Sequence, residues 1–112
     1  MGKVTELDRE IALKIRALRD KSGLTQPQVA SHLGIAYQSY QKMEKGRVSF
    51  RASTLSILAN LYGIRPGQLI DGENVVADPG LAKIVLVAFS LPKEMQEKAV
   101  SALLKIKHRV PV

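Results

Sequence analysis

The chain has 112 residues, a net charge of +7 at neutral pH and 46% apolar residues, enough for one small domain with a short appendage. It has no cysteine, which excludes disulfides, thiol nucleophiles and thiolate metal sites. No apolar stretch is long enough to span a bilayer, and the first ten residues lack the apolar segment of a signal peptide, so we expect a cytoplasmic protein without a membrane partner.

The first predicted element is a helix over residues 5–22. Its apolar residues recur at intervals of four, four and three, the spacing of one helix face: Leu7, Ile11, Ile15 and Leu18. Thr5 suits the N-cap, with Asp8 three residues later, the spacing of a capping box. Gly23 follows and suits the left-handed residue that ends many helices. The pattern therefore predicts an amphipathic helix.

Residues 26–33 form the second predicted helix. Thr25 precedes it as a plausible N-cap, and Pro27 lies in the first turn, where its missing N–H costs nothing. Val29 and Leu33 are four residues apart and share one face. Gly34 then stands where the chain has to turn, and glycine adopts a positive φ there at no steric cost.

The third predicted helix covers residues 37–45 and ends before Gly46. Tyr40 and Met43 are three residues apart and mark its inner face. Ala36 stands at the N-cap position, which weakens the helix start by about 1 kcal/mol unless another group such as the Gln38 side chain compensates. Two short helices joined by a tight turn are typical of the helix-turn-helix motif, whose second helix enters the major groove of DNA.

Two further short helices complete a predicted head. The first covers residues 53–62, and its inward residues are Leu55, Leu58, Ala59 and Tyr62. Gly63 ends this helix, and Pro66 opens a fifth one that contains Leu69 and Ile70. We therefore expect five short helices around one core within residues 1–70.

A second unit follows the head. Residues 71–80 are rich in turn formers and predict a linker. Residues 81–112 predict a helical tail, with a hairpin of two helices over 79–90 and 92–108, although residues 84–89 could equally form a strand because so short an apolar run has no decisive periodicity. A hairpin this apolar must either pack on the head or pair with a second copy. We therefore interpret the tail as a candidate dimerisation element.

The outer face of the third helix is polar and basic. With Tyr40 and Met43 inward, the outward residues are Gln38, Gln41, Lys42 and Lys45, and Tyr37 lies beside them at the edge near the N-terminus. Residues 22–70 contain five basic residues and only one acidic residue, and four of the five basic residues lie between Lys42 and Arg51. Ordinary solvation also produces polar faces, but the preceding turn favours DNA binding, in which Gln pairs with adenine and Lys with guanine.

From about Ile11 to Ile70 the sequence resembles the Cro and phage-repressor family, the Xre-like regulators. This resemblance implies an all-α fold with a five-helix head and implies double-stranded DNA as the partner. It also implies phosphate contacts for Gln26 at the start of the second helix and for Arg47 and Arg51 after the third. Relatives pair a glutamate with an arginine near the end of the first helix, which corresponds here to an ion pair between Glu44 and Arg19. Two residues depart from the family pattern: Ala36 and Tyr40.

The resulting hypothesis is a sequence-specific transcription regulator, a repressor that binds a palindromic operator as a homodimer. Two alternatives stay open: an antitoxin that binds its own operator while its tail masks a toxin, and a helical adaptor whose head binds protein. An enzyme is not expected, because His32 and His108 have no cysteine or carboxylate cluster nearby and no phosphate-binding glycine motif occurs. For the same reasons we expect no metal and no cofactor.

Overall fold

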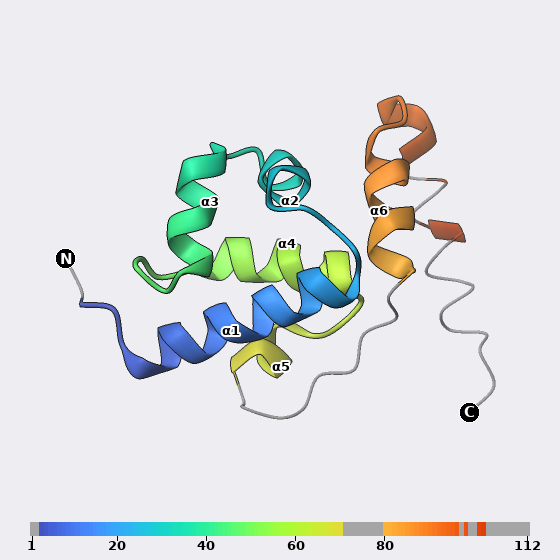
Figure 1. The fold of residues 1–112 in the computed structure, drawn as a ribbon. Coiled ribbons are helices and arrows are strands. Elements are labelled where there is room, and N and C mark those ends of the chain that lie inside the picture. Colours follow the sequence, from blue (N-terminus) through green and yellow to red (C-terminus); the bar gives the residue numbers. More distant parts are fainter. Residues whose placement is uncertain (1–2, 71–79, 97, 99–100, 103–112) are drawn as a thin grey trace.

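The computed structural model describes residues 3–70, 80–96, 98 and 101–102 (Figure 1). These residues are helical or irregular and include no strand, which confirms the expected all-α fold. The helices are, in chain order, α1 (Glu6–Lys21), α2 (Gln26–Leu33), α3 (Tyr37–Glu44), α4 (Ala52–Tyr62), α5 (Pro66–Ile70) and α6 (Leu81–Phe89). Each boundary in the head lies within one residue of its predicted position.

The helix ends of the head follow from local chemistry. Thr5 and Asp8 form a complete capping box at the start of α1, and Thr25 and Gln28 form one at the start of α2. In each box the threonine hydroxyl accepts from a backbone N–H, and the later side chain accepts from the threonine N–H. Gly34 ends α2 at φ 70°, the left-handed conformation expected at this turn.

The core of the head lies between α1, α4 and the helix-turn-helix pair α2–α3. Tyr40, Tyr62 and Leu58 are completely buried in it, as are Ile15 and Leu69. All four residues predicted to face inward on α4 are buried. Helix α5 packs against both α1 and α4, so it closes the core on the side away from α2 and α3 (Figure 1).

The apolar stripe of α1 is shorter than its sequence pattern. Ile11, Ile15 and Leu18 are buried, but Leu7 is 43% exposed. The first turn of α1 is held instead by its capping box and by an exposed ion pair between Arg9 and Glu6. A repeat of apolar residues identifies the inner face of a helix, but it does not indicate how far along the helix the neighbouring elements extend.

The tail begins with a helix, so the strand alternative for residues 84–89 is wrong. Helix α6 packs against α4, and its residue Ala82 is buried in the core of the head. The Lys83 side chain lies over the loop that follows α1, where a Cβ on Gly23 would be 3.1 Å from its Nζ. Residues 93–96 are also helical. Most of the predicted second tail helix, over 92–108, lies outside the described residues, as do residues 71–79 of the predicted linker.

One face of α6 is left uncovered by the head. Ile84 is 50% exposed and Val87 63%. Met95, in the helical segment 93–96 that follows, is 54% exposed. The sequence predicted that the tail either packs on the head or pairs with a second copy. The tail packs on the head through α6, and it also keeps exposed apolar residues on its other side. We call Ile84 and Val87 of α6, together with Met95, the tail face.

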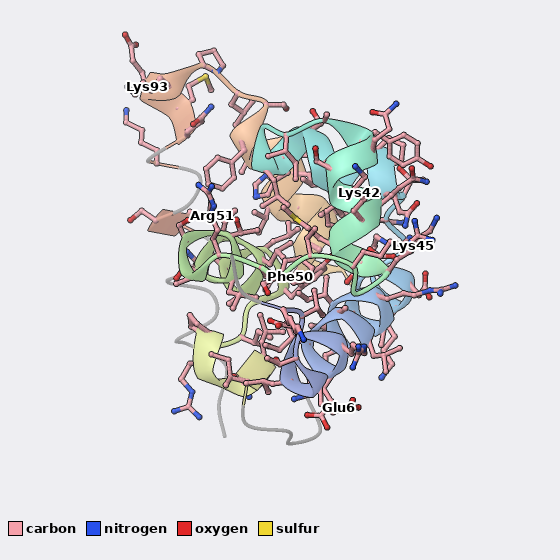
Figure 2. The ribbon with its side chains drawn as sticks, turned by 90° about the vertical axis from the view of Figure 1, so that its left-hand side faces the viewer. Glu6, Lys42, Lys45, Phe50, Arg51 and Lys93 are labelled. Carbon is pink, nitrogen blue, oxygen red and sulfur yellow. The ribbon has the colours of Figure 1, made fainter. Side chains whose placement is uncertain are left out.

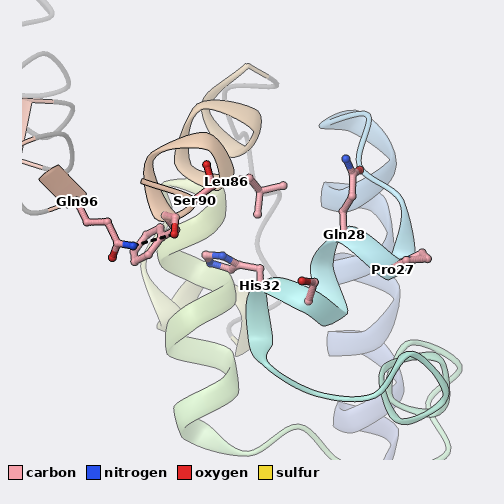
Figure 3. A pocket seen from close by; sticks show the side chains of 8 residues that line it. Pro27, Gln28, His32, Leu86, Ser90 and Gln96 are labelled. Carbon is pink, nitrogen blue, oxygen red and sulfur yellow. Dashed lines mark hydrogen bonds between the residues drawn. The ribbon is translucent and has the colours of Figure 1, made fainter. Parts of the chain in front are cut away.

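His32 joins the head to the tail. Its ring meets the ring of Phe89 edge to face, with 5.2 Å between the centroids. The two residues line a cavity of about 660 Å³ between α2 and α6, which also includes Gln28 and Ser90 (Figure 3). Gln96 closes the far side, and its Nε2 donates to the carbonyl oxygen of Phe89 at 2.9 Å (Figure 3).

The contact between His32 and Phe89 should make the stability of the protein sensitive to mild acid. Burial lowers the pKa of His32 from its ordinary value, so the folded protein favours the neutral ring. The contribution of this residue to stability is complete above the ordinary pKa of about 6.5 and decreases as the pH falls below it. Thermal unfolding at pH 7.5 and 5.5 measures the effect. The His32→Gln variant should lose less stability than the parent between these two pH values, and an equal loss in both would contradict the assignment to His32.

Candidate nucleic-acid interface

Helix α3 presents a continuous polar surface to solvent. Tyr40 and Glu44 are buried, and Met43 is half-buried against the core, so the opposite face of the helix points outward. Gln38, Lys42 and Lys45 are exposed, as the helical wheel predicted, and so is Tyr37 at the edge, whereas Gln41 is half-buried. Figure 2 looks onto this side of the molecule and shows Lys42 and Lys45 along α3.

The loop after α3 adds further positive charge. Arg47 and Arg51 are both exposed. Arg51 occupies the N-cap position of α4, and Figure 2 shows it at the start of that helix, apart from Lys42 and Lys45. Phe50 beside it is buried and ties the loop to the core. The cationic residues thus lie on α3 and in the loop that follows it, which is an arrangement that suits a polyanion.

The start of α3 has no side-chain cap. Ala36 is extended, with φ −65° and ψ 145°, and no side chain accepts from the first N–H groups of the helix. The Gln38 side chain therefore does not take the compensating role that the sequence left open. Backbone N–H groups at a helix start that no side chain caps remain available to solvent or to an anionic oxygen of a ligand.

A buried ion pair joins α1 to α3. Arg19 Nη2 lies 2.7 Å from Glu44 Oε1, and Arg19 Nε lies 2.9 Å from Oε2, which is the two-pronged geometry of the strongest Arg–carboxylate pairs. The side chains are only 12% and 2% exposed. Arg19 Nη1 also donates to the carbonyl oxygen of Leu24 at 3.0 Å, so the same guanidinium holds the loop between α1 and α2.

The ion pair shifts both pKa values in the direction that keeps it charged. Hydrogen bonding to Glu44 raises the pKa of Arg19. Burial alone would raise the pKa of Glu44, but the hydrogen bonds from Arg19 and its other donors outweigh burial and lower it. Glu44 is therefore ionised at neutral pH, although it lies in the interior.

Gln26 is bonded inside the protein. Its Nε2 donates to Glu44 Oε1 at 3.1 Å, and its Oε1 accepts from the Tyr37 hydroxyl at 3.4 Å. Gln41 Nε2 in turn donates to the Tyr37 hydroxyl oxygen at 2.9 Å. Sequence reasoning placed Gln26, Tyr37 and Gln41 at the same surface but missed these bonds. The four-residue spacing of Tyr37 and Gln41 on one helix was the available signal for one of them.

The Tyr40 hydroxyl lies in the same interior region. It is buried and makes no hydrogen bond of standard geometry with the residues that the structure describes. Burial and the nearby negative charge of Glu44 raise the pKa of Tyr40 far above its ordinary range. The Tyr40 hydroxyl therefore has no exit to water, and the Glu44 carboxylate is the polar group that acts on it in the interior.

Other kinds of site are not evident in the part of the chain that the structure describes. Within it, no group of three or more His, Cys, Asp or Glu side chains is placed to hold a metal ion. His32 packs against Phe89, and His108 lies outside the described residues. None of the described helices is long and apolar enough to cross a membrane.

Comparisons with known proteins agree with this geometry. Residues 10–71 match the family model described as "Helix-turn-helix domain". The chain is also similar to a Vibrio cholerae protein described as the cryptic phage CTXphi transcriptional repressor RstR. The two are 31% identical over 84 residues, which cover 75% of this chain and 76% of that protein. No solved structure matches the chain.

Proposed function

The chain belongs to the Cro and phage-repressor (Xre-like) family of helix-turn-helix proteins, which are DNA-binding transcription regulators, and we propose that it is a repressor that binds a palindromic operator as a homodimer. The family match over residues 10–71 confirms the resemblance that the sequence showed from about Ile11 to Ile70. The proposal adds three finer statements: the residues that contact DNA, the symmetry of the complex and the sign of regulation.

The observation that supports the DNA contacts best is the outer face of α3. Gln38, Gln41, Lys42 and Lys45 point away from the core on the second helix of the motif, where side chains reach base edges in the major groove. The two glutamines suit adenine, and the two lysines suit guanine or phosphate. Gln26, Tyr37, Arg47 and Arg51 surround this face, and we assign the two arginines to the DNA backbone.

The tail face supports the homodimer. A single reading helix covers only half of an operator, and two half-sites joined by a two-fold axis require two copies of the chain. Helix α6 lies at the end of the molecule opposite to α3, so a partner on the tail face leaves α3 free for DNA (Figure 1). Ile84 and Val87 form the exposed apolar centre of this surface.

The sign of regulation is proposed from the relative. The similar Vibrio cholerae protein is described as a transcriptional repressor, and the similarity extends over three quarters of both chains. A DNA-bound protein that covers a promoter blocks access of polymerase by occupying the site, and this mechanism requires no further domain.

Selection of bound sequences from a random DNA pool by the purified protein tests the proposal. We expect a palindromic consensus whose half-sites are centred about one helical turn or a multiple of it apart. Sedimentation of the free and the DNA-bound protein gives the number of copies in each. A consensus without symmetry, or a single copy on the selected site, would contradict the homodimer.

The loop arginines should affect binding to every DNA sequence alike. Arg47→Ala and Arg51→Ala each remove one cation that we assign to a phosphate, so the slope of log K against log salt should decrease by about one unit for each lost contact. Titrations of selected and random duplexes at several salt concentrations give both the slope and the sequence preference. Arg65→Ala, which removes an exposed arginine beside α5, is the matched control and should leave the slope unchanged. Unchanged slopes in both loop variants would place these arginines off the DNA.

The exposed tail face also supports a second candidate function, that of an antitoxin whose tail binds a toxin. An exposed apolar surface suits a different protein as well as a second copy. A single small protein that co-purifies in a fixed ratio and masks the tail face would favour the antitoxin. The adaptor alternative predicts no salt-dependent DNA binding, so the titrations above also test it.

A further inference from the structure

Four side chains form a hydrogen-bond chain that runs from the protein interior to the outer face of α3. It begins at the Glu44 carboxylate and continues through the Gln26 amide and the Tyr37 hydroxyl to the Gln41 amide. The donor–acceptor distances along it are 3.1, 3.4 and 2.9 Å. Its inner end is buried with Arg19, and its outer end is Tyr37 and Gln41, on the surface proposed to meet base edges.

The inner end of this hydrogen-bond chain determines which group donates and which accepts at each step. An ionised carboxylate only accepts hydrogen bonds, so the Gln26 amide must turn its nitrogen toward Glu44 and its oxygen toward Tyr37. The Tyr37 hydroxyl then donates its one hydrogen to Gln26. Its oxygen is left as an acceptor, and only the nitrogen of the Gln41 amide can serve as the donor to it. Every step follows from the charge of Glu44, which the hydrogen bonds from Arg19 maintain.

We propose that Glu44 and Tyr37 are positioning residues that orient the Gln41 amide, so that α3 presents the Gln41 oxygen and one remaining N–H to a base edge. This inference rests on the proposed operator binding, since it concerns how Gln41 meets DNA. An acceptor beside a donor matches the N6 amino group and N7 of adenine. Adenine is therefore the base that a pre-oriented Gln41 selects, and Tyr37 acts on DNA through Gln41.

Gln38 provides a matched comparison on the same helix. It is exposed, and its side chain makes no hydrogen bond to any residue in the described part of the chain. Its amide can therefore rotate freely in the unbound protein and becomes ordered only on DNA. The two glutamines differ in preorganisation, although both lie on the outer face of α3.

The first test uses the free protein and requires no knowledge of the operator. Nitrogen-15 relaxation of the side-chain amide groups should show Gln41 more ordered than Gln38 in the parent protein. In the Tyr37→Phe variant, Gln41 should become as mobile as Gln38. Tyr37 is 41% exposed, so its hydroxyl can be removed with little effect on the thermal midpoint. Equal mobility of Gln38 and Gln41 in the parent, or no change in Gln41 in the variant, would overturn the proposal.

The second test uses the sequence that the parent protein selects. Tyr37→Phe should weaken binding to that sequence about fivefold, with the loss confined to the base pair that Gln41→Ala also relaxes. The double variant should bind no more weakly than Gln41→Ala alone, because the hydroxyl acts through Gln41. Gln38→Ala is the control and should cost about 5- to 150-fold at a different base pair.

Two results would overturn the role of Tyr37 on DNA: additive losses in the double variant, or a loss at a base pair other than that of Gln41. A parent protein that selects no sequence overturns the operator proposal and with it the role of Gln41 in base recognition. The order of the Gln41 amide in the free protein still decides whether Glu44 and Tyr37 orient it, so the two failures are distinguishable.

Discussion

Arg19→Ala is expected to lower the free energy of unfolding by about 3–5 kcal/mol, a large part of the stability of a small domain. The substitution leaves the Glu44 carboxylate, which is 2% exposed, without its two-pronged partner. It also leaves the carbonyl oxygen of Leu24 without the guanidinium donor. Urea unfolding at pH 7, followed by circular dichroism, measures the change.

Another arginine of α1 offers a matched control. Arg16 lies 3.9 Å from Asp20, but these side chains are 66% and 60% exposed, so Arg16→Ala should cost no more than about 1 kcal/mol. Arg19→Lys keeps the positive charge but loses the planar, two-pronged guanidinium. Its loss of unfolding free energy should lie between those of Arg19→Ala and Arg16→Ala. Equal midpoints for the Arg19→Ala and Arg16→Ala variants would show that the buried pair contributes no more than a surface pair.

Val87→Glu is expected to convert a dimer into a folded monomer and to weaken operator binding by about 10²- to 10⁴-fold. Val87 is 63% exposed on the tail face, so the added carboxylate meets water in a single copy of the chain. In a dimer built on this face the charge would be buried without a partner, which opposes association. Once the copies separate, binding at one half-site no longer assists binding at the other.

Sedimentation and DNA titration of the same preparations check this result. Leu13→Glu is the matched control, because Leu13 is an apolar residue of α1 that is 68% exposed and lies outside the tail face. It should leave both mass and affinity unchanged. If the Val87→Glu variant keeps the mass and affinity of the parent, the dimer must use another surface. A parent chain that stays monomeric at DNA-binding concentrations would assign the tail face to a different protein.

Most of the head could be predicted because its signals are local. Capping boxes at Thr5 and Thr25 and the left-handed glycine at Gly34 depend on residues within a few positions of each other. The apolar spacing of α4 identified its buried residues for the same reason. The Arg19–Glu44 pair is 25 residues apart in sequence and was anticipated only through the family resemblance; spacing alone does not indicate it.

The sequence by itself determined the all-α fold, the helix boundaries of the head and the outward face of α3, since helix periodicity and end chemistry act over one or two turns. Only the tertiary structure decided that Leu7 stays exposed, that α6 is a helix packed on α4, and that Gln26 turns its amide toward Glu44. Each of these depends on which groups meet across the fold. The burial of a side chain and the direction of its hydrogen bonds depend on residues that are far apart in sequence. The residue pattern within one segment therefore cannot predict them.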